Sequence, residues 1–143
     1  MQHLALDHVA IAVPSIAAAA PLYERVTGEE RSVVEVVGDQ GVAVAFVGML
    51  ELLEPRDPAG TVARFLERNG PGLHHVAYRT PDLRAELARL REEGFELIDA
   101  EPRTGAFGHR VAFLHPRGTG KVLVELVERS DAHGVPGGAA TSP

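Results

Sequence analysis

Two histidines and two glutamates occupy equivalent places in the two halves of this chain. His8 stands in Leu-Asp-His-Val-Ala and His75 in Leu-His-His-Val-Ala, an offset of 67 (75 − 8). Glu51 and Glu125 each lie in an apolar segment near the end of their half, with an offset of 74 (125 − 51). Two imidazoles and two carboxylates suit a divalent ion such as Co, Mn, Ni, Fe, Zn or Mg. The repeat therefore predicts a metal site made of His8, Glu51, His75 and Glu125.

Each of these residues, taken alone, has a simpler explanation. A single histidine in an apolar strand is more often an ordinary core residue, and a glutamate in a strand can point to solvent. The set of four favours the metal, because an ionised acid needs a partner when it is buried. His74 competes with His75, but strand alternation places it on the opposite face, and the offset of 67 selects His75.

The elements that must position these residues are predicted in the same order in both halves. Apolar alternation indicates strands, helical spacing indicates helices, and glycine and proline mark the turns. In the first half we expect a strand at 4–13, a helix at 15–27 in which Pro21 causes a kink or a later start, and strands at 31–37, 42–47 and 50–54. A connector at 56–72 contains a short helix at 61–68. In the second half we expect strands at 73–79, 95–98, 109–114 and 121–128, a loop at 101–108, and a helix that starts at Pro81 with Thr80 as cap.

This order predicts an α+β fold of two βαβββ modules. Each module is too small to bury a full core, so we expect the two small sheets to form one curved sheet around a metal-binding cleft. The predicted domain covers residues 1–129, with module one at about 4–55, the connector at 56–72 and module two at 73–128. Residues 130–143 are rich in Gly, Ala, Pro and Ser and are expected to be a flexible tail.

Composition excludes several classes of protein. The 143 residues carry a net charge of −6 and show no basic stripe, which argues against nucleic acid as a partner. The chain has no cysteine, so disulfides and thiolate metal sites are excluded, and a cytoplasmic location is compatible with this. No apolar run approaches the roughly 20 residues of a membrane span, and no signal peptide is expected.

The chain resembles the vicinal oxygen chelate superfamily, in which glyoxalase I also shows paired βαβββ modules. Within it, the resemblance is strongest to the methylmalonyl-CoA epimerase family, and it extends from about residue 4 to residue 128. The segments that carry it are 6–14 (LDHVAIAVP), 40–46 (QGVAVAF), 50–55 (LELLEP), 72–78 (GLHHVAY), 105–108 (GAFG), 111–116 (VAFLHP) and 122–126 (VLVEL).

This resemblance implies that His8, Glu51, His75 and Glu125 are the metal ligands. It implies epimerisation of methylmalonyl-CoA at C2, by proton abstraction and return through a metal-chelated enolate. Glu125 is the first candidate for proton transfer and Glu51 the second. An acyl-CoA is the implied substrate, and the family commonly forms homodimers.

The acyl-CoA carries several negative charges, so an acidic chain needs a local basic rim to bind it. Arg117 and Lys121 are candidates, as are Arg103 and Arg110, although each is equally well explained as a scattered surface charge. Gln40, in the turn before Val42, is a further candidate substrate contact. His109 lies in a glycine-flanked loop and either reaches the substrate or stays solvated.

The chain departs from the family in two places. The turn between Phe46 and Glu51 is about four residues shorter than usual and lacks a basic residue, and Val44 stands where some epimerases carry a glutamate. Two alternatives therefore stay open: another isomerase of the superfamily, such as a glyoxalase-I-like lactoylglutathione lyase or an acyl-CoA isomerase, and a metal-free binding protein of the same fold. A three-ligand oxygenase, whose ligands come mainly from one module, fits the two-half arrangement poorly.

Overall fold

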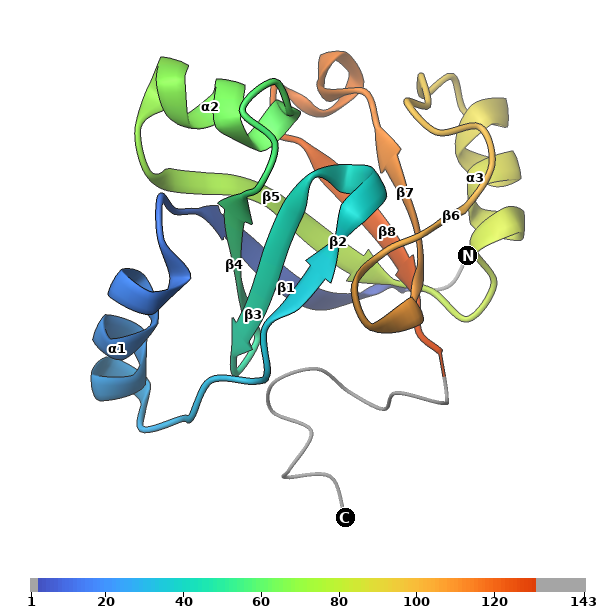
Figure 1. Ribbon diagram of the computed structural model, residues 1–143. Coiled ribbons are helices and arrows are strands. Elements are labelled where there is room, and N and C mark those ends of the chain that lie inside the picture. Colours follow the sequence, from blue (N-terminus) through green and yellow to red (C-terminus); the bar gives the residue numbers. More distant parts are fainter. Residues whose placement is uncertain (1–2, 131–143) are drawn as a thin grey trace. The chain divides into compact units, whose positions relative to one another are not determined.

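The computed structural model describes residues 3–130 (Figure 1). The expected flexible tail therefore lies, apart from Ser130, outside the described residues. The elements are β1 (Ala5–Ala12), α1 (Ile16–Thr27), β2 (Glu35–Val37), β3 (Val42–Val47), β4 (Leu50–Pro55), α2 (Thr61–Asn69), β5 (Gly72–Arg79), α3 (Leu83–Glu92), β6 (Arg103–Thr104), β7 (Arg110–Leu114) and β8 (Val124–Glu128), with short 3₁₀ turns η1 (Gly38–Gln40), η2 (Ala106–Gly108) and η3 (Pro116–Thr119).

The chain divides into two compact units whose boundaries fall inside β1 and β5. Among the described residues, one unit is 9–74, and the other combines 3–8 with 75–130. The first residues of β1 therefore belong to the unit that holds most of module two. The first residues of β5 belong to the unit that holds most of module one. His8 and His75 consequently belong to the same unit, together with Glu125.

In the Val9–His74 unit the strand order is β2-β3-β4-β1. β3 pairs antiparallel with β4, and β4 pairs parallel with β1. Helix α1 packs on β3 and β4 because its apolar side chains recur at helical spacing (Figure 1). The core of this unit consists of Val13, Ile16, Ala20, Ala43, Ala45, Val47 and Leu52.

In the other unit the strand order is β5-β8-β7-β6. β5 pairs parallel with β8, and β8 pairs antiparallel with β7. Helix α3 packs on β7 and β8, as the predicted leucine stripe requires. The core consists of Leu83, Leu87, Leu90, Ala112, Leu114 and Leu126.

The two modules repeat each other at the level of single hydrogen bonds. In module one the side chain of Glu54 accepts a bond of 2.8 Å from the first helical N–H, that of Ile16. In module two Glu128 accepts a bond of 2.8 Å from the N–H of Leu83. The two donors are related by the offset of 67 and the two acceptors by the offset of 74, so the duplication predicted from the sequence is structural.

The first helix begins where it was predicted, whereas the second begins later. The first helix runs unbroken through Pro21, with Ser15 capping the N–H of Ala18 at 3.1 Å. The carbonyl that loses its donor belongs to Ala17, which is exposed and open to water. In module two Asp82, not Thr80, is the cap: it accepts from the N–H of Ala85 at 3.1 Å, so Pro81 precedes the helix.

Several strands are shorter than predicted because side-chain atoms accept main-chain N–H groups that would otherwise bond to a neighbouring strand. Residues 31–34 stay outside β2: Arg31 makes only an isolated bridge to Val47, and the side chain of Ser32 accepts the N–H of Phe46 at 2.9 Å. Segment 95–98 makes only an isolated bridge, because Asp99 accepts the N–H of Phe113 at 2.9 Å. The loop at 101–108 contains the short strand β6, and the last strand begins at Val124.

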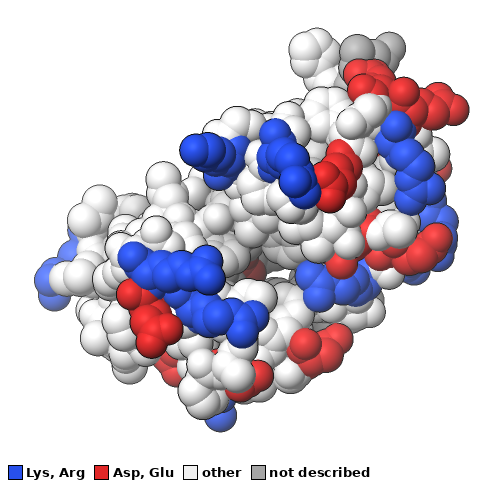
Figure 2. Space-filling model, turned by 90° about the horizontal axis from the view of Figure 1, so that it is seen from above, with Lys and Arg blue, Asp and Glu red and all other residues white. Residues whose placement is uncertain are grey.

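Among residues 3–130, no helix has both the length and the apolar character needed to cross a membrane. On the face drawn in Figure 2, basic and acidic side chains are interspersed rather than separated into one basic stripe.

Candidate metal and active site

His8 is a buried residue of β1 whose ring is held from behind by the preceding aspartate. Nδ1 of His8 lies 2.7 Å from Oδ2 of Asp7. An ionised carboxylate only accepts hydrogen bonds, so Nδ1 carries the proton that it donates. The Nε2 lone pair of the neutral ring then points away from Asp7.

Glu125 brings both histidines together from β8. Its Oε1 lies 3.2 Å from Nε2 of His8 and 3.3 Å from Nε2 of His75. The two rings face each other edge-on, with centroids 5.6 Å apart. Phe113 of β7 packs its ring edge-on against His75, with centroids 5.2 Å apart, and covers one side of the cluster with apolar surface. The structure therefore brings the predicted ligands His8, His75 and Glu125 together.

The donor set of this cluster fits a divalent cation. In the neutral tautomer of His8 fixed by Asp7, Nε2 is an acceptor, and the Glu125 oxygen that it faces is also an acceptor. Oε1 of Glu125 is buried and has no hydrogen-bond donor among the described residues. Two lone pairs meet favourably only with a proton or a metal ion between them, and His8 and Glu125 are both of the types that bind Co, Mn, Fe, Ni or Zn.

The charge state of Glu125 agrees with a role as a ligand. Burial by itself raises the pKa of this carboxyl, but its interactions with His75 and His8 outweigh burial and lower the pKa from 4.5 to about 2. Glu125 is thus ionised at neutral pH, as a metal ligand must be.

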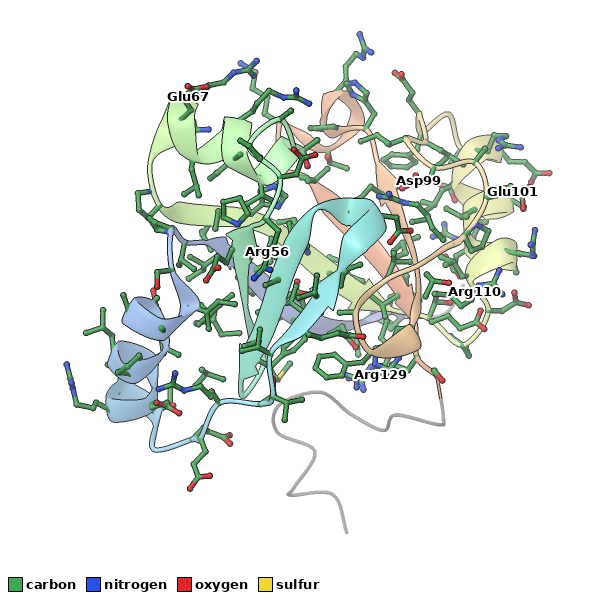
Figure 3. The ribbon with its side chains drawn as sticks, in the orientation of Figure 1. Arg56, Glu67, Asp99, Glu101, Arg110 and Arg129 are labelled. Atoms are coloured by element: carbon green, nitrogen blue, oxygen red, sulfur yellow. The ribbon has the colours of Figure 1, made fainter. Side chains whose placement is uncertain are left out.

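The neighbouring Asp7 is also ionised. Its burial raises the pKa, while the hydrogen bond from Nδ1 of His8 and the charge of Arg129 lower it below the usual 3.8. Nε of Arg129 lies 2.7 Å from Oδ1 of Asp7. Figure 3 labels Arg129, the residue that follows β8.

Glu51, the fourth predicted ligand, is a buried residue of β4 in the Val9–His74 unit. It lies opposite Ala10 in the parallel β1–β4 pair, and Glu125 lies opposite Ala77 in the parallel β5–β8 pair. Ala10 and Ala77 each come two residues after the predicted histidine of their strand. The register thus confirms that Glu51 and Glu125 are equivalent within their modules.

The predicted substrate contacts have different surroundings. His109 is only 4% exposed, so the solvated role considered for it is wrong: its Nδ1 accepts a hydrogen bond of 2.7 Å from the N–H of Ser130. Arg117 is exposed and forms an ion pair of 3.1 Å with Glu96. Lys121 is exposed, with a left-handed φ of 74°. Gln40 is half-buried in η1.

Two of the predicted basic-rim residues are already neutralised. Arg103 forms an ion pair of 3.1 Å with Asp99, and Arg117 is held by Glu96. The guanidinium of Arg103 also lies over the ring of Phe113, at 5.8 Å from its centroid. Both arginines must exchange these carboxylates for phosphate if they are to contact an acyl-CoA.

Sequence reasoning missed Asp7, Phe113 and Arg129 as parts of the site. The signal for Asp7 was its place beside His8, and the signal for Phe113 was the triplet Val-Ala-Phe, which occurs at 44–46 and again at 111–113. Nothing in the sequence distinguished Arg129 from other surface arginines, because its partner lies at the opposite end of the chain.

Comparison with known proteins assigns the chain to a class. Residues 7–113 match the Glyoxalase/Bleomycin resistance protein/Dioxygenase superfamily, and the chain belongs to it. This confirms the predicted fold class of βαβββ modules and the resemblance described from the sequence. Within the superfamily, its relatives place the chain in the methylmalonyl-CoA epimerase family.

Three proteins illustrate this relationship. The chain is 41% identical to the ethylmalonyl-CoA/methylmalonyl-CoA epimerase of Cereibacter sphaeroides, over 85% of this chain and 95% of that protein. A variant of the Streptomyces coelicolor methylmalonyl-CoA epimerase in complex with 2-nitronate-propionyl-CoA matches with a TM-score of 0.85 and 35% identity, over 90% of this chain and 97% of that chain. A methylmalonyl-CoA epimerase in complex with methylmalonyl-CoA and NH4+ matches with a TM-score of 0.86 and 34% identity, over 92% and 99%.

Proposed function

We propose that this protein is a metal-dependent epimerase that inverts C2 of methylmalonyl-CoA. The observation that carries the proposal is the convergence of His8, His75 and Glu125, in which Oε1 of Glu125 lies 3.2 Å from one Nε2 and 3.3 Å from the other. The relationship of the chain to methylmalonyl-CoA epimerases supports it.

The proposed metal ligands are His8, Glu51, His75 and Glu125. His8, His75 and Glu125 are supported by their mutual geometry. Glu51 is supported by its equivalence to Glu125, since each follows the same register in its own module. When bound there, a divalent cation would supply Lewis acidity and stabilise negative charge that develops on substrate oxygens.

The proton transfers fall to two carboxylates in this proposal. One carboxylate takes the proton from C2 as the C–H bond breaks, and the electron pair delocalises into the adjacent thioester carbonyl. The other acid then returns a proton to the opposite face of C2, which inverts the centre. Glu125 is the first candidate and Glu51 the second. Val44 is buried and apolar, so its position on β3 offers no competing base.

The remaining residues of the site act by position. Asp7 orients His8, and Phe113 shields the side of His75 from water, which strengthens the electrostatic interactions of the site. Gln40, Arg117 and Lys121 stay the proposed direct contacts of the acyl-CoA, and His109 is proposed to act indirectly. His109 takes part through the loop that it supports, because its own ring is buried.

The test is to incubate the protein with (R)- and with (S)-methylmalonyl-CoA in deuterated water, with and without added cobalt. Starting from either epimer, we expect deuterium to enter C2 and the other epimer to form. Removing the metal should abolish both the exchange and the epimerisation. Purified protein that retains no divalent metal and catalyses no exchange would support the metal-free binding protein instead.

A second candidate function is the isomerisation of a related substrate. One observation favours it: β3 and β4 are joined by the two residues Gly48 and Met49, with Val47 paired to Leu50, so the short turn predicted from the sequence is real. A panel of methylmalonyl-CoA, ethylmalonyl-CoA and the hemithioacetal of glutathione separates these activities by their relative kcat/KM.

The proposal also includes a cytoplasmic location and a homodimer. A highly charged acyl-CoA does not cross a bilayer unaided, so its epimerase works where that acyl-CoA is made.

The homodimer is proposed to form at β2, which is an edge strand. Val36 on this strand and Val34 just before it are exposed, so the edge offers an apolar surface to a second copy of the chain. Light scattering of the wild type and of V34E/V36E tests the dimer, which the double variant is expected to dissociate.

A further inference from the structure

Asp7 is a deeply buried carboxylate with a cation on one side and a candidate metal ligand on the other. It is 2% exposed. Oδ2 lies 2.7 Å from Nδ1 of His8, and Oδ1 lies 2.7 Å from Nε of Arg129. Nε of Arg79 lies farther from the same oxygen, at 3.7 Å. The carboxylate is therefore divided between an imidazole and a guanidinium, with one oxygen for each.

This arrangement determines how His8 meets the site. Because Asp7 accepts the Nδ1 proton, the neutral ring keeps its lone pair on Nε2, which is the atom that faces Glu125 at 3.2 Å. If the ring took the other tautomer, Nδ1 and Oδ2 would be two acceptors in close contact with no proton between them. Asp7 thus fixes both the proton position and the rotation of the ring.

Arg129 offsets the free-energy cost of burying the charge of Asp7. Its side chain is 14% exposed, and a buried carboxylate needs an opposite charge or several hydrogen bonds. Arg129 follows β8, the strand that carries Glu125. β8 therefore fixes His8 from two sides: Glu125 lies in front of the ring, and Arg129 holds the aspartate behind it.

Module two carries a different residue at the position equivalent to Asp7. The offset of 67 places His74 where module one has the aspartate. The ring of His74 packs edge-on against Phe65, with centroids 5.0 Å apart. The two histidines of the site are therefore supported differently, and only His8 has a carboxylate behind it from its preceding residue.

We propose that Asp7 and Arg129 are a positioning pair that holds His8 as the Nδ1–H tautomer and so prepares Nε2 for the metal, an inference that rests on the proposed metal site. Neither residue touches substrate in this proposal. Removing the pair lowers metal affinity at a site whose ligands are all still present. For partners of this kind the loss is roughly 10–100-fold.

The test measures cobalt affinity by calorimetry for wild type, D7N, D7A, R129K and R129M. H74A is the matched control at the equivalent position, and R79K is the control for the more distant arginine. We expect the Kd for cobalt to rise for D7N, D7A and R129M, to stay closer to wild type for R129K, and to be unchanged for H74A and R79K. Far-UV circular dichroism verifies that each variant is folded.

A second readout does not depend on metal or activity. Nitrogen-15 NMR of the imidazole groups in the metal-free protein reports the tautomer of His8, assigned by comparison with H8Q. We expect Nδ1–H in wild type and a mixture of tautomers in D7A. An Nε2–H tautomer in wild type, or an unchanged cobalt affinity in folded D7A, would overturn the positioning role. A wild type that binds no divalent metal refutes the proposed function, while the NMR result still decides whether Asp7 fixes the ring.

Discussion

Oε1 of Glu125 lies 3.2 Å from Nε2 of His8, although the two residues come from opposite ends of the chain. The contact joins the acid of the last strand, β8, to the histidine of the first strand, β1. It brings an ionised carboxylate to the ring nitrogen that Asp7 leaves without a proton. The roles of this acid, of its equivalent Glu51 and of the scaffold around them can each be tested separately.

Replacing either glutamate by glutamine should distinguish proton transfer on one face of C2 from proton transfer on the other. E125Q keeps the shape of the side chain but cannot take a proton, so its rate of epimerisation should fall roughly 10²–10⁴-fold. E51Q should block the transfer on the other face. Deuterium exchange is then expected to persist from one epimer in E125Q and from the opposite epimer in E51Q.

The control for this pair is E128Q, an acid on the same strand that caps α3 instead. It should leave exchange unaffected below its unfolding temperature. Rapid exchange from both epimers in E125Q would remove Glu125 from proton transfer.

Removing metal should lower the stability of the wild-type protein. A ligand that binds only the folded state stabilises it, by about 2.7 kcal/mol when its concentration is one hundred times Kd. Thermal unfolding in chelator, followed by titration with cobalt or manganese, measures this. H8A/H75A should show no such dependence, because it lacks both imidazoles. If added metal does not change the unfolding temperature of the wild type, the proposed metal site is wrong.

The two helix-capping glutamates should contribute independently to stability. Glu54 and Glu128 each accept a hydrogen bond of 2.8 Å from the first N–H of a helix. By analogy with other cap removals, E54A and E128A should each cost about 0.5–2 kcal/mol in the free energy of unfolding. Since they lie in different units, the double variant should show the sum in urea unfolding.

Lys121→Gly should stabilise the fold. Lys121 has a φ of 74°, a left-handed conformation that costs a residue with a side chain roughly 1–2 kcal/mol relative to glycine. Urea unfolding should therefore give K121G a higher midpoint than wild type, and K121A a midpoint close to it. If Lys121 also contacts the acyl-CoA, both variants should raise KM equally. The effect on stability, seen only in K121G, is then distinguished from the effect on substrate binding, seen in both.

The Glu24–Arg31 pair should make stability depend on pH. The side-chain and main-chain hydrogen bonds from Arg31 lower the pKa of Glu24 below its ordinary 4.5. A depressed carboxyl pKa contributes stability that is present above 4.5 and is lost as pH falls through the lower folded value. Unfolding midpoints of E24Q should therefore fall less than those of wild type over that acidic range, and equal slopes would refute the contribution.

The sequence predicted the local elements well because their signals are local. The leucines at 83, 87 and 90 follow the helical period, and α3 buries all three. The boundaries failed where a distant or neighbouring side chain intervened. The side chain of Ser32 accepts the N–H of Phe46 where a strand was predicted, and Asp82 takes the cap from Thr80; neither competition is visible in a hydrophobic pattern.

The amino-acid sequence by itself determined the duplicated modules, the paired histidines and acids, and the superfamily, because each depends on residue type and spacing along the chain. Only the tertiary structure decided that Glu125 meets both histidines, that His109 is buried, and that Arg129 supports Asp7. These contacts join residues far apart in the sequence. Their distances and proton positions follow from how strands pair and pack, which no local pattern encodes.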